Sequence, residues 1–145
     1  GVQTCALPIY YIFNTKSNVS RGKHAHKNLK QVLIALKGNC EIILDDGKNQ
    51  DKITLNSPSQ GLYIEGLLWR EMQNFSPDCV LLVLADNYYN EEDYIREYKD
   101  FNKHLQTKKH ISVSQATPSN AETTKKILTC EFCNKIYKDI ISKLI

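Results

Sequence analysis

The sequence predicts an all-β fold, a β-sandwich or small barrel, with helices only in the C-terminal part. Two observations support this prediction. Short apolar runs recur at similar intervals along residues 10–85, and Gly, Pro, Asn and Asp residues separate them. Strands of this length and spacing are typical of sandwiches and barrels. With 145 residues, the chain is long enough for one domain whose hydrophobic core needs no disulfide bonds.

The expected strands follow one another with clear turn signals. Lys37-Gly38-Asn39 separates two apolar runs, and Asp45-Asp46-Gly47 is a strong hairpin signal. A segment with two histidines, residues 24–26, is expected to be extended because a polar stretch, an apolar run and a turn follow it. The expected strands are 10–13, 24–26, 32–36, 40–44, 52–55, 61–64, 69–75 and 80–85.

Helix is expected only after the last of these strands. One helix is predicted from about Glu91 to His104, and its acidic first turn suits the helix dipole. Residues 106–118 are polar and without pattern, which predicts a linker. Residues 119–145 predict an amphipathic helix. Its signals are a capping box, Ser119-Asn120-Ala121-Glu122, and an apolar stripe of Ile127, Leu128, Phe132, Ile136, Ile140, Ile141 and Leu144.

The tail helix carries two of the five cysteines, Cys130 and Cys133. This pair could form half of a zinc site, but two ligands cannot close a tetrahedral shell. We therefore expect the helix to pack on the body of the protein, on a partner copy or against a further domain. The cysteines are scattered and no secretory signal peptide is present, so a reducing, cytoplasmic location is expected.

The charge pattern argues against nucleic acid as a partner. The net charge is +3, but residues 1–102 hold 11 basic and 13 acidic side chains, whereas residues 103–145 hold 8 and 3. The basic character therefore belongs to the tail and not to the expected body. No apolar run approaches the roughly 20 residues that a membrane span needs, so no membrane partner is expected either.

The first nine residues resemble a translated sequencing adapter. On this interpretation residues 1–9 are not native, and the genuine sequence begins near Tyr10, partway into a strand, so the domain is truncated at its N-terminus. The alternative is an ordinary strand that begins after Pro8. In neither case do these residues enter the functional argument.

The clearest candidate for chemistry is His24-Ala25-His26, which follows Arg21-Gly22. On an extended backbone, two residues separated by one other point to the same face, with Cα atoms roughly 6–7 Å apart. Such a pair can bind a metal or transfer protons. A third alternative is that both histidines are exposed strand residues without a role.

The stretch from His24 to Gly38 resembles the first motif of the cupin superfamily. In metal-dependent cupins, the position of Gln31 usually holds Glu, and a further His occurs where this chain has Arg70. Gln lacks the charge that a divalent cation favours, and a guanidinium opposes such a cation electrostatically. A metal-free histidine site is therefore the better inference. A metal cupin with an unusual ligand set stays open.

A longer set of motifs resembles the sugar 3,4-ketoisomerases, which are WxcM-like cupins. The resemblance covers roughly residues 10–105. It implies a cupin jelly-roll of the RmlC-like type, a homodimer and no cofactor. The motifs are Tyr10-Tyr11-Ile12-Phe13, Arg21-Gly22, His24-Ala25-His26-Lys27, Gln31-Val32-Leu33, Leu44-Asp45-Asp46-Gly47, Gly61-Leu62-Tyr63, Trp69-Arg70-Glu71-Met72, Phe75-Ser76, residues 80–85, Tyr88-Tyr89 and Asp93-Tyr94-Ile95-Arg96.

The resemblance also implies a reaction. These enzymes move the ketone of dTDP-4-keto-6-deoxy-glucose from C4 to C3, for 3-amino-3,6-dideoxy sugars of surface polysaccharides. Imidazole has an ordinary pKa near 6.5 and can both accept and donate protons at neutral pH. We expect His24 to transfer the carbon-bound proton and His26 to relay protons between the two oxygens, although the order could be reversed.

Five further residues are assigned to the substrate site. Arg21 and Arg70 are the expected partners of the diphosphate, although Arg21 could instead brace its turn. An arginine at position 70 also resembles the branch of this family whose products have the gluco configuration at C4. Gln31, Tyr11 and Trp69 complete the expected site, with a core position as the alternative for both aromatic residues. A non-catalytic or inactivated nucleotide-sugar-binding cupin is the alternative function.

Overall fold

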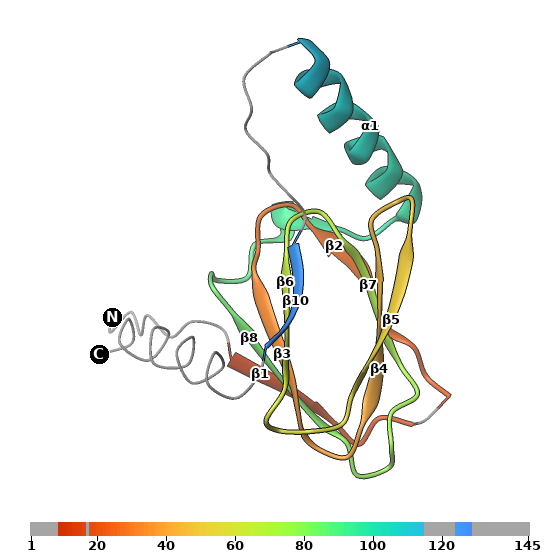
Figure 1. Ribbon diagram of the computed structural model, residues 1–145, viewed down its shortest axis with the longest axis vertical. Helices are drawn as coiled ribbons and strands as arrows, with labels where there is room; N and C mark the ends of the chain where they lie inside the picture. Colours follow the sequence, from red (N-terminus) through yellow and green to blue (C-terminus); the bar gives the residue numbers. More distant parts are fainter. Residues whose placement is uncertain (1–8, 17, 115–123, 129–145) are drawn as a thin grey trace, which may run out of the picture.

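The computed structural model describes the backbone of residues 9–16, 18–114 and 124–128, and side chains up to residue 107. Its strands form two antiparallel sheets that face each other, with one long helix at one end (Figure 1). The predicted all-β fold is confirmed. The strands are β1 (Ile9–Phe13), β2 (Arg21–His26), β3 (Gln31–Lys37), β4 (Cys40–Asp45), β5 (Gln50–Leu55), β6 (Gly61–Glu65), β7 (Trp69–Gln73), β8 (Val80–Ala85), β9 (Tyr94–Ile95) and β10 (Thr124–Leu128).

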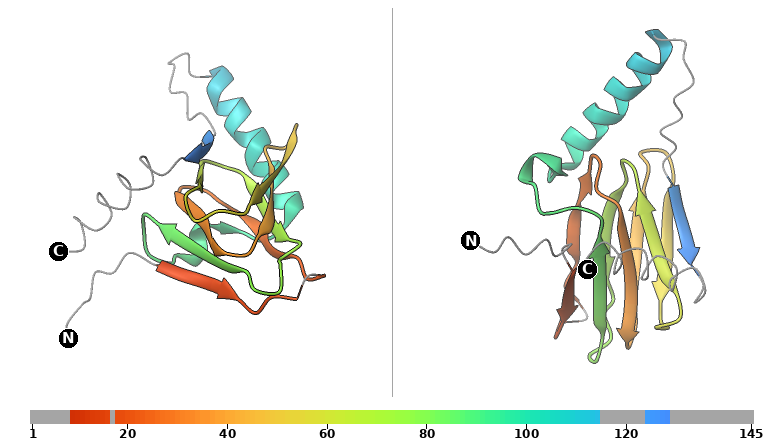
Figure 2. Two further views of the ribbon diagram at one scale, coloured as in Figure 1. Left: turned by 60° about the horizontal axis from the view of Figure 1, so that its bottom comes forward. Right: turned by 90° about the vertical axis from the view of Figure 1, so that its left-hand side faces the viewer.

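Each sheet has five strands. The order in sheet 1 is β1-β8-β3-β6-β10, and the order in sheet 2 is β5-β4-β7-β2-β9. From β6 onward, successive strands alternate between the two sheets, so the connections cross from one sheet to the other (Figure 2). Crossing connections of this kind are those of a jelly roll.

A hydrophobic core fills most of the space between the sheets. Alternate residues of each strand point inward, because side chains in a strand alternate between its two faces. On β3 these are Leu33 and Ala35, and on β4 they are Ile42 and Leu44, all at most 2% exposed. The core holds the two sheets at a fixed separation and therefore fixes the frame on which the polar residues are placed.

The hairpin between β4 and β5 forms where the sequence predicts it. Asp45 Oδ1 accepts a hydrogen bond from the Gly47 amide at 2.6 Å, and Asp46 Oδ1 accepts from the Lys48 and Asn49 amides at 2.8 and 2.7 Å. Gly47 has a φ of 83°, which costs glycine little because it has no Cβ. Short acidic side chains thus satisfy the amides that the turn leaves without strand partners.

A second, smaller cluster lies on the other face of sheet 2. The first turns of α1 (Tyr98–Ser114) pack there, with Phe101 fully buried against Trp69, Ala25 and Ile95. Figure 1 shows the rest of α1 extending beyond the end of the sandwich. Within the described part of the chain, neither this helix nor any other has the length and hydropathy that a bilayer span requires.

The predicted helix from Glu91 was wrong in its start and its end. Residues Glu91–Asp93 form a single 3₁₀ turn that Asn90 caps, and Tyr94–Ile95 form β9, which pairs with the histidine strand. The α-helix begins at Tyr98 and continues to Ser114, so residues 106–114 of the predicted linker are helical. Pairing with β2 outweighed the helical signal of the acidic run, because tertiary contacts override weak local propensity.

The tail prediction was also wrong where the structure describes it. Residues Thr124–Leu128 form β10, antiparallel to β6, instead of part of a helix. Pairing with β6 satisfies the backbone groups that the edge of sheet 1 would otherwise leave unpaired. The spacing of apolar residues along the sequence does not show where such an unpaired edge lies. Residues 1–8, the remainder of the tail and its two cysteines lie outside the described residues.

Candidate active site

The site begins at a bulge in β2. Arg21 lies opposite Met72 of β7, and His24 lies opposite Arg70, so β2 has one residue more than its partner between these pairs. Gly22 has a φ of 92°, and a Cβ there would lie 3.1 Å from the Met72 side chain. The extra residue re-aims the strand, which is a common use of bulges beside active sites.

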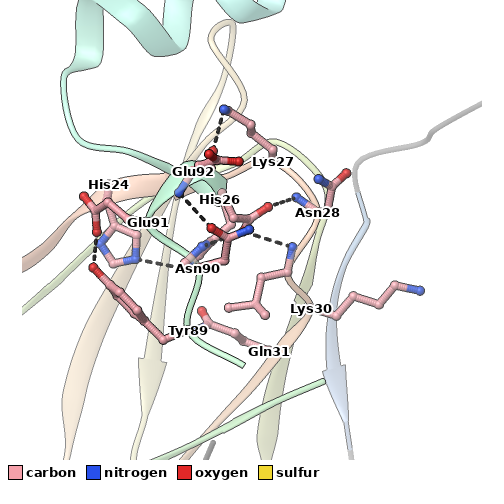
Figure 3. A network of polar contacts seen from close by, with 12 residues as sticks. His24, His26, Lys27, Asn28, Lys30, Gln31, Tyr89, Asn90, Glu91 and Glu92 are labelled. Carbon is pink, nitrogen blue, oxygen red and sulfur yellow. Dashed lines mark hydrogen bonds and ion pairs between the residues drawn. The ribbon is translucent and has the colours of Figure 1, made fainter. Parts of the chain in front are cut away.

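The two histidines are in direct contact. Their Nε2 atoms are 3.1 Å apart, and the rings meet nearly edge to face. His26 is completely buried, whereas His24 is partly exposed. The two rings therefore lie together on one face of β2, as the spacing predicts (Figure 3), and His24 is the more accessible of the two.

The second nitrogen of each ring has a partner that can only accept a hydrogen bond. His24 Nδ1 lies 2.5 Å from the carbonyl oxygen of Gly22, and His26 Nδ1 lies 3.0 Å from Oδ2 of Asp93. We infer that both Nδ1 atoms carry hydrogen and donate. In the neutral pair, both Nε2 atoms are then unprotonated and face each other, and a single added proton can be shared between them.

Asp93 joins this pair to the chain around it. Its Oδ1 accepts from the amide of Asn28 at 2.8 Å and its Oδ2 from the amide of Leu29 at 3.4 Å. Its backbone oxygen accepts from the amide of Lys27 at 3.0 Å. The carboxylate is thus fixed in position from the segment that directly follows the histidine strand.

Tyr94 covers the pair from β9. Its ring centroid lies 4.2 Å from that of His26 and 5.1 Å from that of His24. The Arg96 guanidinium lies 4.6 Å from the centre of the same ring, and Arg96 also forms an ion pair with Glu91 at 2.7 Å. Tyr89, whose ring centroid lies 5.3 Å from that of Tyr94, donates from its hydroxyl to the Glu91 carboxylate (Figure 3). The aromatic ring limits the access of water to the imidazoles.

A buried polar network faces the histidines from the other strands. Arg70, 2% exposed, donates from Nη1 to Oε1 of Gln31 at 2.5 Å, which connects sheet 2 to sheet 1. Gln31 donates from Nε2 to the hydroxyl oxygen of Tyr10 at 3.4 Å. Burial lowers the pKa of Arg70 to about 10, so the guanidinium stays charged at neutral pH.

Burial and charge keep the imidazoles neutral. Burial lowers the pKa of His24 to about 4, and the nearby Arg70 charge acts in the same direction. The pKa of His26 is also lowered, first by burial and then by Arg70, although Asp93 opposes this shift. At neutral pH both rings are therefore neutral bases that carry one hydrogen each. A proton that either ring accepts is held between two nitrogens and is balanced by the Asp93 carboxylate.

Three expected site residues do not reach the histidine pair in this structure. Tyr11 is 63% exposed, and its ring lies against Phe13. Trp69 points to the outer face of sheet 2, donates from Nε1 to Glu71 and packs on Phe101. Arg21 is exposed and lies before the bulge. Strand alternation explains the first two, since their neighbours Tyr10 and Arg70 occupy the inward positions.

Sequence reasoning missed Asp93, Tyr94 and Tyr10 as site residues. Asp93 was expected only as part of the acidic first turn of a helix, whereas its carboxylate is held against His26. One signal was available, because Asp93 and Tyr94 belong to a motif that supported the resemblance. Among the described residues, no group of three or more His, Cys, Asp or Glu side chains is arranged to hold a metal ion.

Comparison with known proteins identifies a family whose sequences match this chain. The FdtA family, described as WxcM-like, C-terminal, matches residues 5–106. The chain belongs to this family. A curated relative from Aneurinibacillus thermoaerophilus, TDP-4-oxo-6-deoxy-alpha-D-glucose-3,4-oxoisomerase, is 55% identical over 97 residues, which cover 67% of this chain and 70% of the relative.

Solved structures agree with this assignment. The TDP-quinovose 3,4-ketoisomerase WlaRB from Campylobacter jejuni is 56% identical, with a TM-score of 0.63 over 66% of this chain and 74% of that one. A mutant of the 3,4-ketoisomerase QdtA from Thermoanaerobacterium thermosaccharolyticum, in complex with TDP-4-keto-6-deoxyglucose, is 46% identical, with a TM-score of 0.68 over 69% and 72% of the two chains. The rmlC epimerase of Mycobacterium tuberculosis, 12% identical with a TM-score of 0.51 over 60% and 48%, shares the fold alone. The predicted cupin jelly-roll is thus confirmed.

Proposed function

We propose that this protein is an isomerase that moves the keto group of dTDP-4-keto-6-deoxy-glucose from C4 to C3. One observation carries the proposal. Two imidazoles that are neutral at pH 7 lie with their Nε2 atoms 3.1 Å apart in a buried site, in a chain that belongs to the FdtA family. The named relatives of this family act on the same class of TDP-sugar.

The reaction requires two proton movements. A base removes the proton on C3, and the C4 carbonyl oxygen gains a proton, which gives an enediol with a C3–C4 double bond. The C3 hydroxyl then loses its proton, C4 accepts one, and the ketone is at C3. Electrons balance within the sugar, so the step needs no external oxidant or reductant. General base catalysis typically contributes roughly 10²–10⁴ in rate.

The partial exposure of His24 supports its assignment to the carbon-bound proton. His26 lies behind it and can pass a proton across the short contact between the Nε2 atoms. The Arg70 charge, held inside the sandwich by Gln31, would stabilise negative charge that develops on the sugar oxygens. Arg21, exposed at the start of β2, remains our proposed partner of the diphosphate.

Two finer proposals concern the product and its fate. The arginine at position 70 supports the gluco configuration at C4. A 3-keto sugar is the substrate that an aminotransferase would convert to a 3-amino-3,6-dideoxy sugar for surface polysaccharide. We also propose that the protein acts in the cytoplasm as a homodimer.

Proton NMR in deuterated water tests the activity directly. Incubation with dTDP-4-keto-6-deoxy-glucose should shift the ring signals to those of a 3-keto sugar and should place deuterium from solvent on C4. The couplings of the new C4 proton in ordinary water give its configuration. Tight binding of the nucleotide sugar without turnover would favour a binding module instead, and a stoichiometric metal required for turnover would overturn the metal-free mechanism.

Substitution assigns the two histidines. H24N and H26N should each reduce turnover, and residual exchange at only one carbon would separate their roles. K52M is a suitable control, because Lys52 is an exposed partner of Glu41 on the edge strand β5. Full turnover by both histidine variants would refute the proposed roles.

A further inference from the structure

The carboxylate of Asp93 contacts the buried histidine and the backbone of β2's continuation at the same time. Its Oδ2 lies 3.0 Å from His26 Nδ1, and its Oδ1 accepts from the Asn28 amide at 2.8 Å. The His26 side chain is fully buried and the Asp93 side chain is 13% exposed. This is the only carboxylate that a hydrogen bond or ion pair connects to either site histidine among the described residues.

We propose that Asp93 is a positioning residue for the isomerisation, which fixes the tautomer of His26 so that its unprotonated Nε2 faces His24. The inference rests on the proposed function for its kinetic consequence, but its structural part concerns the free protein. An ionised carboxylate can only accept, so His26 must carry its proton on Nδ1. His26 Nε2 is then available as a base.

The opposite tautomer would block the pair. If His26 carried its proton on Nε2, that proton would point at His24 Nε2, 3.1 Å away. Both Nε2 atoms would then be used in a hydrogen bond between neutral rings, and neither could accept a proton from the sugar. A carboxylate at position 93 therefore selects the state of the pair that can act as a base.

Asn at position 93 tests this selection with minimal change of shape. Its Oδ1 can keep the bond from the Asn28 amide, while its amide NH₂ would donate to His26 Nδ1 and force the proton of His26 to Nε2. We expect D93N to lower kcat by about 10- to 100-fold with little change in KM, as for other residues that orient a functional side chain. The ¹⁵N shifts of the imidazoles should change from the Nδ1–H to the Nε2–H tautomer at His26.

Asp86 provides a matched control. It is exposed, and its Oδ1 accepts from the amide of Lys30, in the loop after β2, at 2.9 Å. Among the described residues, no hydrogen bond or ion pair connects Asp86 to a histidine. D86N removes a carboxylate with the same capping role, and it should leave kcat and the imidazole shifts unchanged. D93E keeps the charge and should retain the Nδ1–H tautomer and more activity than D93N.

The outcomes separate this inference from the proposed function. A D93N protein with the wild-type tautomer and kcat, or an equal loss in D93N and D86N, would overturn the role of Asp93. If D93N does not fold, D93E decides, since an Nε2–H tautomer in that variant would contradict the inference. If the wild-type protein does not isomerise the sugar, the proposed function fails, while the imidazole shifts still test the assignment of Asp93.

Discussion

The interior of the sandwich has two ends of opposite character. At one end, inward residues such as Leu33, Ile42 and Met72 form a continuous apolar core. At the other end, the inward positions of the same strands hold Gln31 on β3 and Arg70 on β7. On β3 and on β7, a core position and a site position are thus only two residues apart.

This difference shows how the fold divides stability from chemistry. The apolar end gains free energy from burial, roughly 25 cal/mol for each Å² removed from water. The polar groups at the other end lose their hydrogen bonds to water on burial, and bonds within the protein replace only some of them. Arg70 Nε has no hydrogen-bond partner among the described residues. We therefore expect substitutions at the two ends to affect different measurements.

The largest effect on stability is expected at the apolar end. I42A should lower the free energy of unfolding by about 2–5 kcal/mol, because it leaves a cavity between Met72 and the opposite sheet. Urea unfolding measures this change. I53A is the control, at a partly buried position opposite Ile42, and should lower the free energy of unfolding by less. Equal losses in both variants would contradict the core described above.

Acid should destabilise the protein through the polar end. The folded pKa of His24, about 4, lies below its unfolded value near 6.5, and that of His26 is lowered too. The stabilising contribution is complete above pH 6.5 and is lost as pH falls towards 4. Between pH 6 and pH 5, the free energy of unfolding should fall by about 2–3 kcal/mol for the two histidines together.

The groups that face the imidazoles set the size of this acid effect. Arg70 of β7 opposes protonation, Asp93 favours it at His26, and the Tyr94 ring covers both rings. Urea unfolding at pH 6 and pH 5 gives the change in stability. The double variant H24Q/H26Q should show a much smaller change. An unchanged pH dependence in that variant would place the acid sensitivity elsewhere.

A smaller effect is expected from the bond that crosses the polar end. Q31L removes the acceptor of Arg70 Nη1 and should cost about 1–3 kcal/mol in unfolding free energy. The double variant Q31L/R70M should recover most of this loss, because replacement of both polar partners by apolar groups is often close to neutral. It should also abolish turnover. A double variant less stable than Q31L would contradict this assignment.

The smallest effect is expected on the outer face of sheet 2. W69F keeps an aromatic ring against Phe101 but removes the Nε1 bond to Glu71, so stability should fall by only about 1 kcal/mol. Turnover should stay at the wild-type level, because Trp69 and Arg70 point to opposite faces. Steady-state kinetics measure this. A large loss of kcat would show that Trp69 reaches the substrate as first predicted from the sequence.

The sequence predicted those parts of the site that depend on local spacing. His24 and His26 share a face because they are two residues apart on one strand. The hairpin at Asp45 was predictable for the same reason. Gln31 and Arg70 were linked to the site only through the resemblance to a family, since they lie on different sheets.

The missed features depend on pairings distant in sequence. Asp93 reaches His26 because a two-residue strand, β9, pairs with β2, and so short a strand leaves no period in the sequence. Both faces of β7 are covered, so the sequence could not show whether Trp69 or Arg70 points inward. The same ambiguity applies to Tyr10 and Tyr11 on β1.

The bulge at Gly22 and Lys23 has a consequence for comparisons between homologues. It adds one residue to β2 relative to β7, so Arg21 and His24 lie three positions apart but oppose residues only two positions apart. An alignment to a cupin without this bulge needs a one-residue gap here. Without the gap, either the arginine or the histidines are matched to the wrong structural positions, and a role transferred across the bulge is displaced by one residue.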